Sequence, residues 1–91
     1  MFISFMAMST NQLTYLARQG GRIAYDTTGS GPLVICVPGM GDLRSTYRHL
    51  APELVSAGYR VVTTDLRGHG DSDTTFAEYG DEATASDIVA L

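Results

Sequence analysis

Cysteine, lysine and tryptophan are nearly missing from this sequence of 91 residues, which has one, none and none of them, respectively. A single cysteine excludes a framework of internal disulfides. No apolar stretch approaches the ~20 residues needed to cross a bilayer. Residues 1–8 are apolar, but they are short and lack a basic flank, so they make a poor signal peptide. We therefore expect a cytoplasmic protein of one domain at most, with residues 1–11 as a disordered leader and no membrane partner.

Basic residues are also missing from the last quarter of the chain. All six arginines lie before residue 68, and residues 68–91 contain acidic side chains but no lysine or arginine. The net charge is -4. Because nucleic-acid binding needs clustered basic side chains to meet the phosphates, this balance excludes nucleic acid as a partner.

Apolar runs separated by glycine-rich turns dominate what is present. Alternating patterns at 13–17 and 22–27 flank Gly20-Gly21 and predict an antiparallel hairpin. After the hairpin we expect a turn at 28–32 and a strand covered on both faces at 33–37. A helical segment should follow over 42–58, with a short turn at 45–49 and with Pro52 near the start of a second helix. The remaining elements are a strand at 59–64, a loop at 66–80 and a helix from Asp81.

The strands at 33–37 and 59–64 each run into a glycine-rich turn, and a helical segment joins them. This order is typical of two parallel strands with a crossover helix, and it predicts an α/β fold. Both turns then lie at the carboxyl ends of the strands, which is the edge where open α/β sheets bind ligands. The helix from Asp81 has no stop signal before Leu91, so we expect residues 12–91 to be the front part of a longer domain.

The most specific motif is the run Asp65-Leu66-Arg67-Gly68-His69-Gly70-Asp71-Ser72. Together with the hairpin, the strand at 33–37 and Gly58-Tyr59-Arg60-Val61-Val62, it resembles the α/β-hydrolase superfamily over about residues 12–91. The resemblance implies the N-terminal part of an α/β-hydrolase sheet, with an antiparallel hairpin followed by parallel strands. It further implies a hydrolase of esters or related carbonyl compounds that uses a nucleophile–His–acid triad and acts on a small molecule. No cofactor and no metal are implied.

The same resemblance assigns roles in the two loops. The backbone N–H of Met40 corresponds to an oxyanion-hole donor. The residues implied at the mouth of the substrate pocket are Gly39, Gly41, Asp42 and Leu43. Those implied to shape the second loop are Asp65, Arg67, Gly68, His69, Gly70 and Ser72.

This sequence departs from the family pattern at several points. Pro38 stands where the family usually has histidine. Gly41, where an epoxide-hydrolase-type loop has proline, argues against that type of loop. The family's Gly-x-Ser-x-Gly elbow is missing from residues 1–91, so we expect the triad to lie beyond residue 91 and the fragment to be inactive.

Several reactive side chains have a simpler interpretation. Ser72 and His69 are expected to serve the loop rather than catalysis, because neighbouring residues do not easily adopt triad geometry. Cys36 is expected in the core. Arg44 and Arg48 are expected to be a solvated pair. The acidic spacing from Asp71 onward lacks the glycine of a calcium loop, so no metal is expected there.

Two other classes of protein remain as alternatives. Gly39-x-Gly41 after a strand, with Asp65 ending the next strand, approaches a dinucleotide-binding Rossmann fingerprint, but Arg44 replaces the third glycine. A Rossmann-type oxidoreductase fragment is therefore the weaker hypothesis. A non-catalytic protein with the α/β-hydrolase fold is the other, since one fold hosts many functions.

Overall fold

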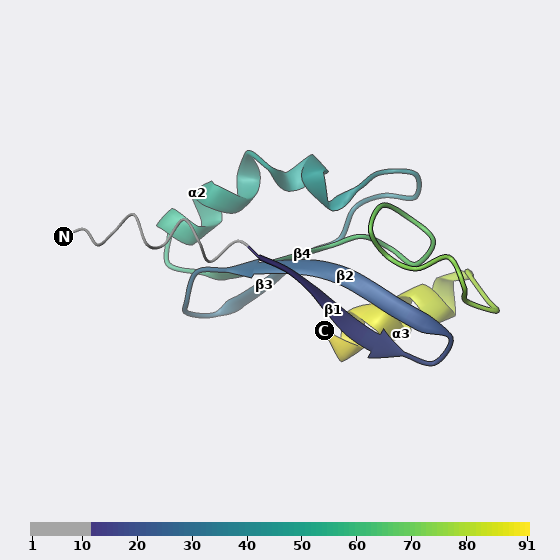
Figure 1. Ribbon diagram of the computed structural model, residues 1–91. Helices are drawn as coiled ribbons and strands as arrows, with labels where there is room; N and C mark the ends of the chain where they lie inside the picture. Colours follow the sequence, from purple (N-terminus) through teal and green to yellow (C-terminus); the bar gives the residue numbers. More distant parts are fainter. Residues whose placement is uncertain (1–11) are drawn as a thin grey trace.

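The computed structural model describes residues 12–91, in which four strands form one mixed sheet. The prediction of a disordered leader at residues 1–11 lies outside the described residues. Figure 1 shows the elements in chain order, which are β1 (Gln12–Arg18), β2 (Gly21–Thr28), β3 (Leu33–Cys36), the 3-10 helix η2 (Arg44–Tyr47), α2 (Leu50–Ser56), β4 (Arg60–Thr64) and α3 (Asp81–Ala90).

The predicted hairpin is confirmed. β1 and β2 pair antiparallel, from Gln12 opposite Thr27 to Arg18 opposite Gly21. A two-residue connection leaves Gly20 at the corner with a φ of +95°, a backbone conformation that glycine adopts without steric cost. In a hairpin the length of the loop fixes the register, so the two-residue connection determines which residues of β1 and β2 face each other.

The predicted parallel pair is also confirmed. The strand order is β1-β2-β4-β3, and β3 runs parallel to β4 with Val34 opposite Val61 and Cys36 opposite Thr63. β4 pairs with β2 in the antiparallel sense. The helical segment between β3 and β4 forms η2 and α2, and Pro52 occupies the first turn of α2, where a missing backbone donor is tolerated. Gly58 follows the helix with a φ of +98°.

The expectation that 33–37 is covered on both faces is wrong for the residues that the structure describes. β3 forms the edge of the sheet, Leu33 is 49% exposed, and only Cys36 in this strand is buried. The faces of a strand are covered by helices, and in residues 12–91 α2 and η2 pack mainly against β4 rather than β3. Cys36 lies in the core as expected, and burial raises the pKa of its thiol.

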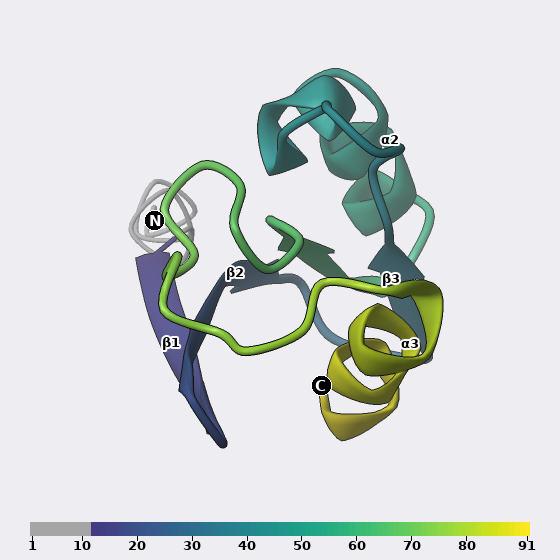
Figure 2. The same cartoon turned by 90° about the vertical axis from the view of Figure 1, so that its right-hand side faces the viewer.

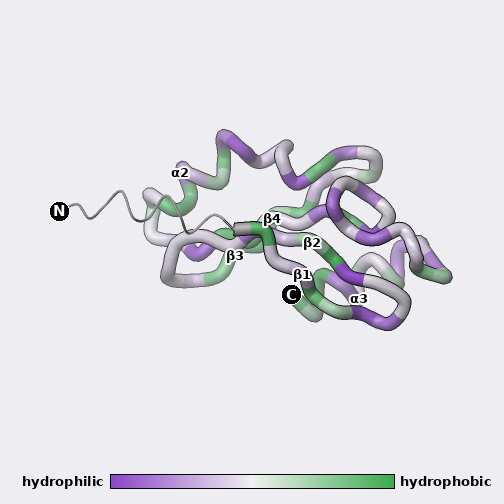
Figure 3. The backbone as a smooth tube through the Cα atoms, in the orientation of Figure 1, coloured by the Kyte–Doolittle hydropathy of each residue, from purple (hydrophilic) through white to green (hydrophobic). Residues whose placement is uncertain are grey.

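The helices lie on opposite faces of the sheet. Figure 1 shows α2 on one side and α3 on the other, and the rotated view of Figure 2 confirms this arrangement. Figure 3 shows both apolar and polar residues along the two helices, and the residue of α3 that is buried against the rest of the structure is the charged Asp87. The buried apolar residues are Ile23, Ala24, Cys36, Val61, Val62, Leu66 and Phe76.

Candidate active site

Two loops leave the carboxyl ends of the parallel strands β3 and β4. The first contains a tight turn at residues 39–42, and the second is the long loop at residues 65–80 (Figure 2). The second loop continues along the start of β2, where Asp73 N–H donates to Arg22 O at 2.9 Å. The sheet thereby brings the two glycine-rich segments to the edge at which α/β proteins assemble their sites.

The 39–42 turn closes with a hydrogen bond from Asp42 N–H to Gly39 O at 2.9 Å. Gly41 has a φ of +91°, which only glycine adopts readily. Met40 is 69% exposed, and its N–H donates to no partner among residues 12–91. At the entry to the turn, Tyr47 Oη donates to Val37 O at 2.6 Å. The Met40 N–H is therefore free to donate to a ligand, and hydrogen bonds hold the backbone of the turn around it.

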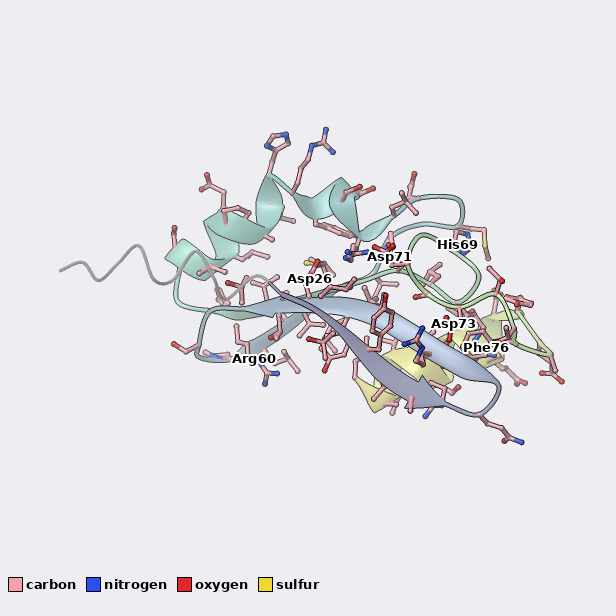
Figure 4. The ribbon with its side chains drawn as sticks, viewed as in Figure 1. Asp26, Arg60, His69, Asp71, Asp73 and Phe76 are labelled. Atoms are coloured by element: carbon pink, nitrogen blue, oxygen red, sulfur yellow. The ribbon has the colours of Figure 1, made fainter. Side chains whose placement is uncertain are left out.

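Side chains of the 65–80 loop hold this turn in place. Gly41 N–H donates to His69 Nε2 at 3.2 Å, and Arg44 N–H donates to Asp65 Oδ1 at 2.7 Å. His69 Nδ1 lies 3.0 Å from Arg67 O. A carbonyl oxygen only accepts, so the proton of the neutral imidazole is assigned to Nδ1, and Nε2 is left as the acceptor for Gly41. Figure 4 shows His69 at the top of this loop.

Arg44 lies in a cluster of three carboxylates. Its Nε donates to Asp26 at 2.7 Å, and its Nη1 donates to Asp71 at 3.0 Å and also to Asp65. Burial by itself lowers the pKa of Arg44, but the hydrogen bonds to Asp26 and Asp71 outweigh it and raise that pKa above its ordinary value. The expected solvated pair is thus wrong for Arg44, whereas Arg48 is exposed and donates only to Ser45 O.

Asp65 holds the start of the 65–80 loop through several hydrogen bonds that it accepts. Its side chain is fully buried and accepts hydrogen bonds from Arg44 and from Asp71 N–H at 3.0 Å. Ser72 is 4% exposed, and its hydroxyl donates to Asp65 O while accepting from Ala24 N–H, both at 2.8 Å. With both directions of its hydroxyl engaged, Ser72 is not placed to act as a nucleophile.

Arg67 is the anchor between the same loop and α3, and the sequence patterns did not identify its partner. Its Nε and Nη2 donate to the two oxygens of Asp87 at 2.8 Å, and its Nη1 donates to Glu78 O. The guanidinium stacks 4.1 Å from the ring centre of Phe76. Asp87 is 2% exposed and also accepts from Arg18 Nε. Apolar periodicity marks the inward face of a helix by its apolar residues, so it gives no sign of the charged Asp87 on that face.

The ion pair between Arg67 and Asp87 should make the stability of the protein depend on pH. Burial raises the pKa of Asp87, but hydrogen bonds from Arg67 and Arg18 outweigh it and leave that pKa below its ordinary value. A depressed carboxyl pKa stabilises the fold above the unfolded-state pKa of about 3.9, and the stabilisation is lost as the pH falls through the folded-state pKa. We expect urea midpoints measured between pH 5 and pH 2 to fall. Asp87→Asn should show a shallower fall, and an unchanged slope would contradict this role.

An open groove lies elsewhere, between the sheet and α2. Leu43, Arg44, Asp65 and Asp71 belong to its lining, together with residues of β2 and α2. Of the residues expected at the pocket mouth, the groove includes Leu43, whereas Gly39, Gly41 and Asp42 lie outside it with Met40. The groove and the Met40 donor are thus separate features of the described part of the chain.

The fold and its two loops define a class of protein, and comparison with known proteins names it. Residues 32–91 match the family described as the alpha/beta hydrolase fold, so this chain belongs to that family. It is 33% identical over 78 residues to bifunctional epoxide hydrolase 2 of Sus scrofa, covering 84% of this chain and 14% of that protein.

Solved structures agree with this assignment. An epoxide hydrolase from an endophytic Streptomyces superposes with a TM-score of 0.81 and 35% identity, covering 89% of this chain and 25% of that one. An esterase from Exiguobacterium antarcticum gives 0.77 and 31%, with 86% and 30% covered. The chain therefore spans between 14% and 30% of the length of these relatives. The hydrolase fold class predicted from the sequence is confirmed.

The Rossmann alternative is wrong. The family match covers both loops. Asp65, which ends the second strand of the Rossmann-like fingerprint, is buried and accepts hydrogen bonds from Arg44 and from Asp71 N–H. Within residues 12–91, no helix is both long and apolar enough to cross a membrane.

Proposed function

We propose that the complete protein is a hydrolase that cleaves an ester or a related carbonyl bond of a small molecule, and that residues 1–91 supply part of its oxyanion hole. The observation that carries this proposal is the Met40 N–H in the 39–42 turn, which has no partner within residues 12–91 and lies at the carboxyl end of a parallel strand pair. A main-chain donor held in that way stabilises negative charge with no reorganisation during the reaction.

In the proposed reaction, a nucleophile attacks the carbonyl carbon and the carbonyl oxygen gains a negative charge. Met40 N–H donates to that oxygen, and the bond to the leaving group then breaks to give a covalent acyl-enzyme that water hydrolyses. The nucleophile, the acid and the histidine lie outside residues 1–91 in this proposal, because the sequence has no Gly-x-Ser-x-Gly and Ser72 is enclosed. Gly39, Gly41, Asp42 and Leu43 border the substrate. No cofactor or metal takes part.

Removing the Met40 donor should reduce turnover. In the complete protein we expect Met40→Pro, which has no backbone N–H, to lower kcat by about 100-fold to 1,000-fold. Met40→Ala keeps the donor and should stay within a few-fold of the wild type. Hydrolysis of a nitrophenyl ester measures both, and thermal unfolding checks that the proline variant is folded. Equal activity of the two variants would remove Met40 from the mechanism.

Residues 1–91 alone should not turn over esters. Only one oxyanion donor and no triad are present in this part of the proposed enzyme, so we expect no release of nitrophenol above the rate of the buffer. Turnover that survives Ser72→Ala and Cys36→Ala would show that a nucleophile has been overlooked. The purified fragment and both variants are compared at equal concentration.

Epoxide opening is a second candidate, favoured by the names of the relatives. The Sus scrofa and Streptomyces proteins are epoxide hydrolases, and glycine at position 41 does not prevent a 33–35% identity to them. Assaying the complete protein on a styrene-type epoxide and on a nitrophenyl ester separates the two. Diol formation without ester cleavage would replace the ester proposal.

A further inference from the structure

We propose that His69 is a positioning residue for the oxyanion hole, and that its neutral imidazole holds the 39–42 turn by accepting the Gly41 N–H. This inference rests on the proposed function of Met40. His69 touches neither the substrate nor the reacting atoms in this proposal, and it acts through the turn.

The turn has few other constraints near Met40. A side chain added at Gly41 would meet nothing within 4 Å, so no packing neighbour limits the backbone there. Within residues 12–91, the turn is held by its own Asp42-to-Gly39 bond and by the bond from Gly41 N–H to His69. Gly41 directly follows Met40, so the bond to His69 fixes the peptide next to the donor. An error of about 1 Å in such a donor can cost about 100-fold in rate.

The hydrogen bond from Gly41 N–H to His69 requires an unprotonated Nε2. Nδ1 lies at Arg67 O, so Nε2 can accept only while the ring is neutral. A second proton on Nε2 would place two donors face to face, and the turn would lose its tether. Charged groups on the segments around the imidazole are Asp42 on the turn, Arg44 on η2, and Asp65, Arg67 and Asp71 on its own loop.

Two substitutions in the complete protein separate the effect of the hydrogen-bond acceptor at position 69 from the effect of filling the space. Gln at position 69 offers an acceptor near the place of Nε2 that does not gain a proton, whereas Phe fills the space and offers none. We expect His69→Phe to lower kcat by roughly 10-fold to 100-fold with a smaller change in KM. His69→Gln should recover most of that loss. Two variants of equal activity would overturn the proposal.

The amide signal of Gly41 in a nitrogen–proton NMR spectrum tests the bond without any substrate. It should move in His69→Phe, which removes the acceptor, and stay near its wild-type position in His69→Gln. If the signal moves in this way but the protein hydrolyses nothing, the proposed function fails while the hydrogen bond stands. If activity is present and the signal does not move, the hydrogen bond fails alone.

Discussion

Replacing Asp87 by asparagine is expected to lower the free energy of unfolding by about 3–5 kcal/mol, because it leaves the Arg67 guanidinium buried without a counter-charge. The Arg67 side chain is 9% exposed and that of Asp87 is 2% exposed, so water cannot replace the lost partner. Two parallel hydrogen bonds of 2.8 Å make this a bidentate pair, the strongest arrangement of these groups. Urea unfolding of wild type and variant at pH 7 measures the difference.

Arg18 offers the matched control for this prediction. It contacts the same Asp87 at 3.0 Å, but its side chain is 29% exposed. Arg18→Gln should therefore cost about 1 kcal/mol or less. Joint replacement of Arg67 by Met and Asp87 by Leu should recover much of the loss, since an apolar pair of similar volume can replace buried ions. A loss below about 1 kcal/mol for Asp87→Asn would contradict the claim that the pair of Arg67 and Asp87 stabilises the fold.

Gly70→Ala is expected to destabilise the protein by at least about 3 kcal/mol, since it combines backbone strain with a direct collision. Gly70 has a φ of +49°, and a Cβ there would lie 2.6 Å from Cγ of Asp65. Asp65 is fully buried and accepts the backbone N–H groups of Arg44 and Asp71. Moving it would disturb both loops. Thermal unfolding, with urea titration for the free energy, provides the measurement.

Gly58→Ala isolates the backbone contribution. Gly58 has a φ of +98°, but an added Cβ would meet nothing within 4 Å. We expect a loss of about 1–2 kcal/mol, from conformation alone. If Gly70→Ala costs no more than Gly58→Ala, then the contact with Asp65 has no energetic weight. If the larger cost is found, the start of η2 should also lose order, because Arg44 N–H donates to Asp65.

Much of the secondary structure could be predicted from local patterns. The hairpin followed from alternation around Gly20 and Gly21, and the strand at β4 followed from its apolar run and from Gly58 before it. Pro52 correctly marked the start of α2. These features depend on residues a few positions apart, whose geometry is set by the chain itself.

The candidate site could be predicted from the sequence only in part. The 39–42 turn could be located from its glycines and from the resemblance, but its tether to His69 spans 28 residues of sequence. The cluster around Arg44 draws carboxylates from β2, the end of β4 and the following loop. Nothing in the spacing of Asp26, Asp65 and Asp71 indicates that one arginine meets all three, which is why Arg44 was expected in solvent.

By itself, the sequence determined the order of strands and helices along the chain and the parallel pair, because apolar periodicity and glycine turns act over short distances. The hydrolase fold class followed from the resemblance of the motif at residues 65–72 to that family. Only the tertiary structure decided that Asp87 is buried against Arg67 and that His69 accepts from Gly41. Those outcomes depend on which strands become neighbours. Hydrogen bonds and burial between distant residues exist only after the sheet has placed them within about 3 Å.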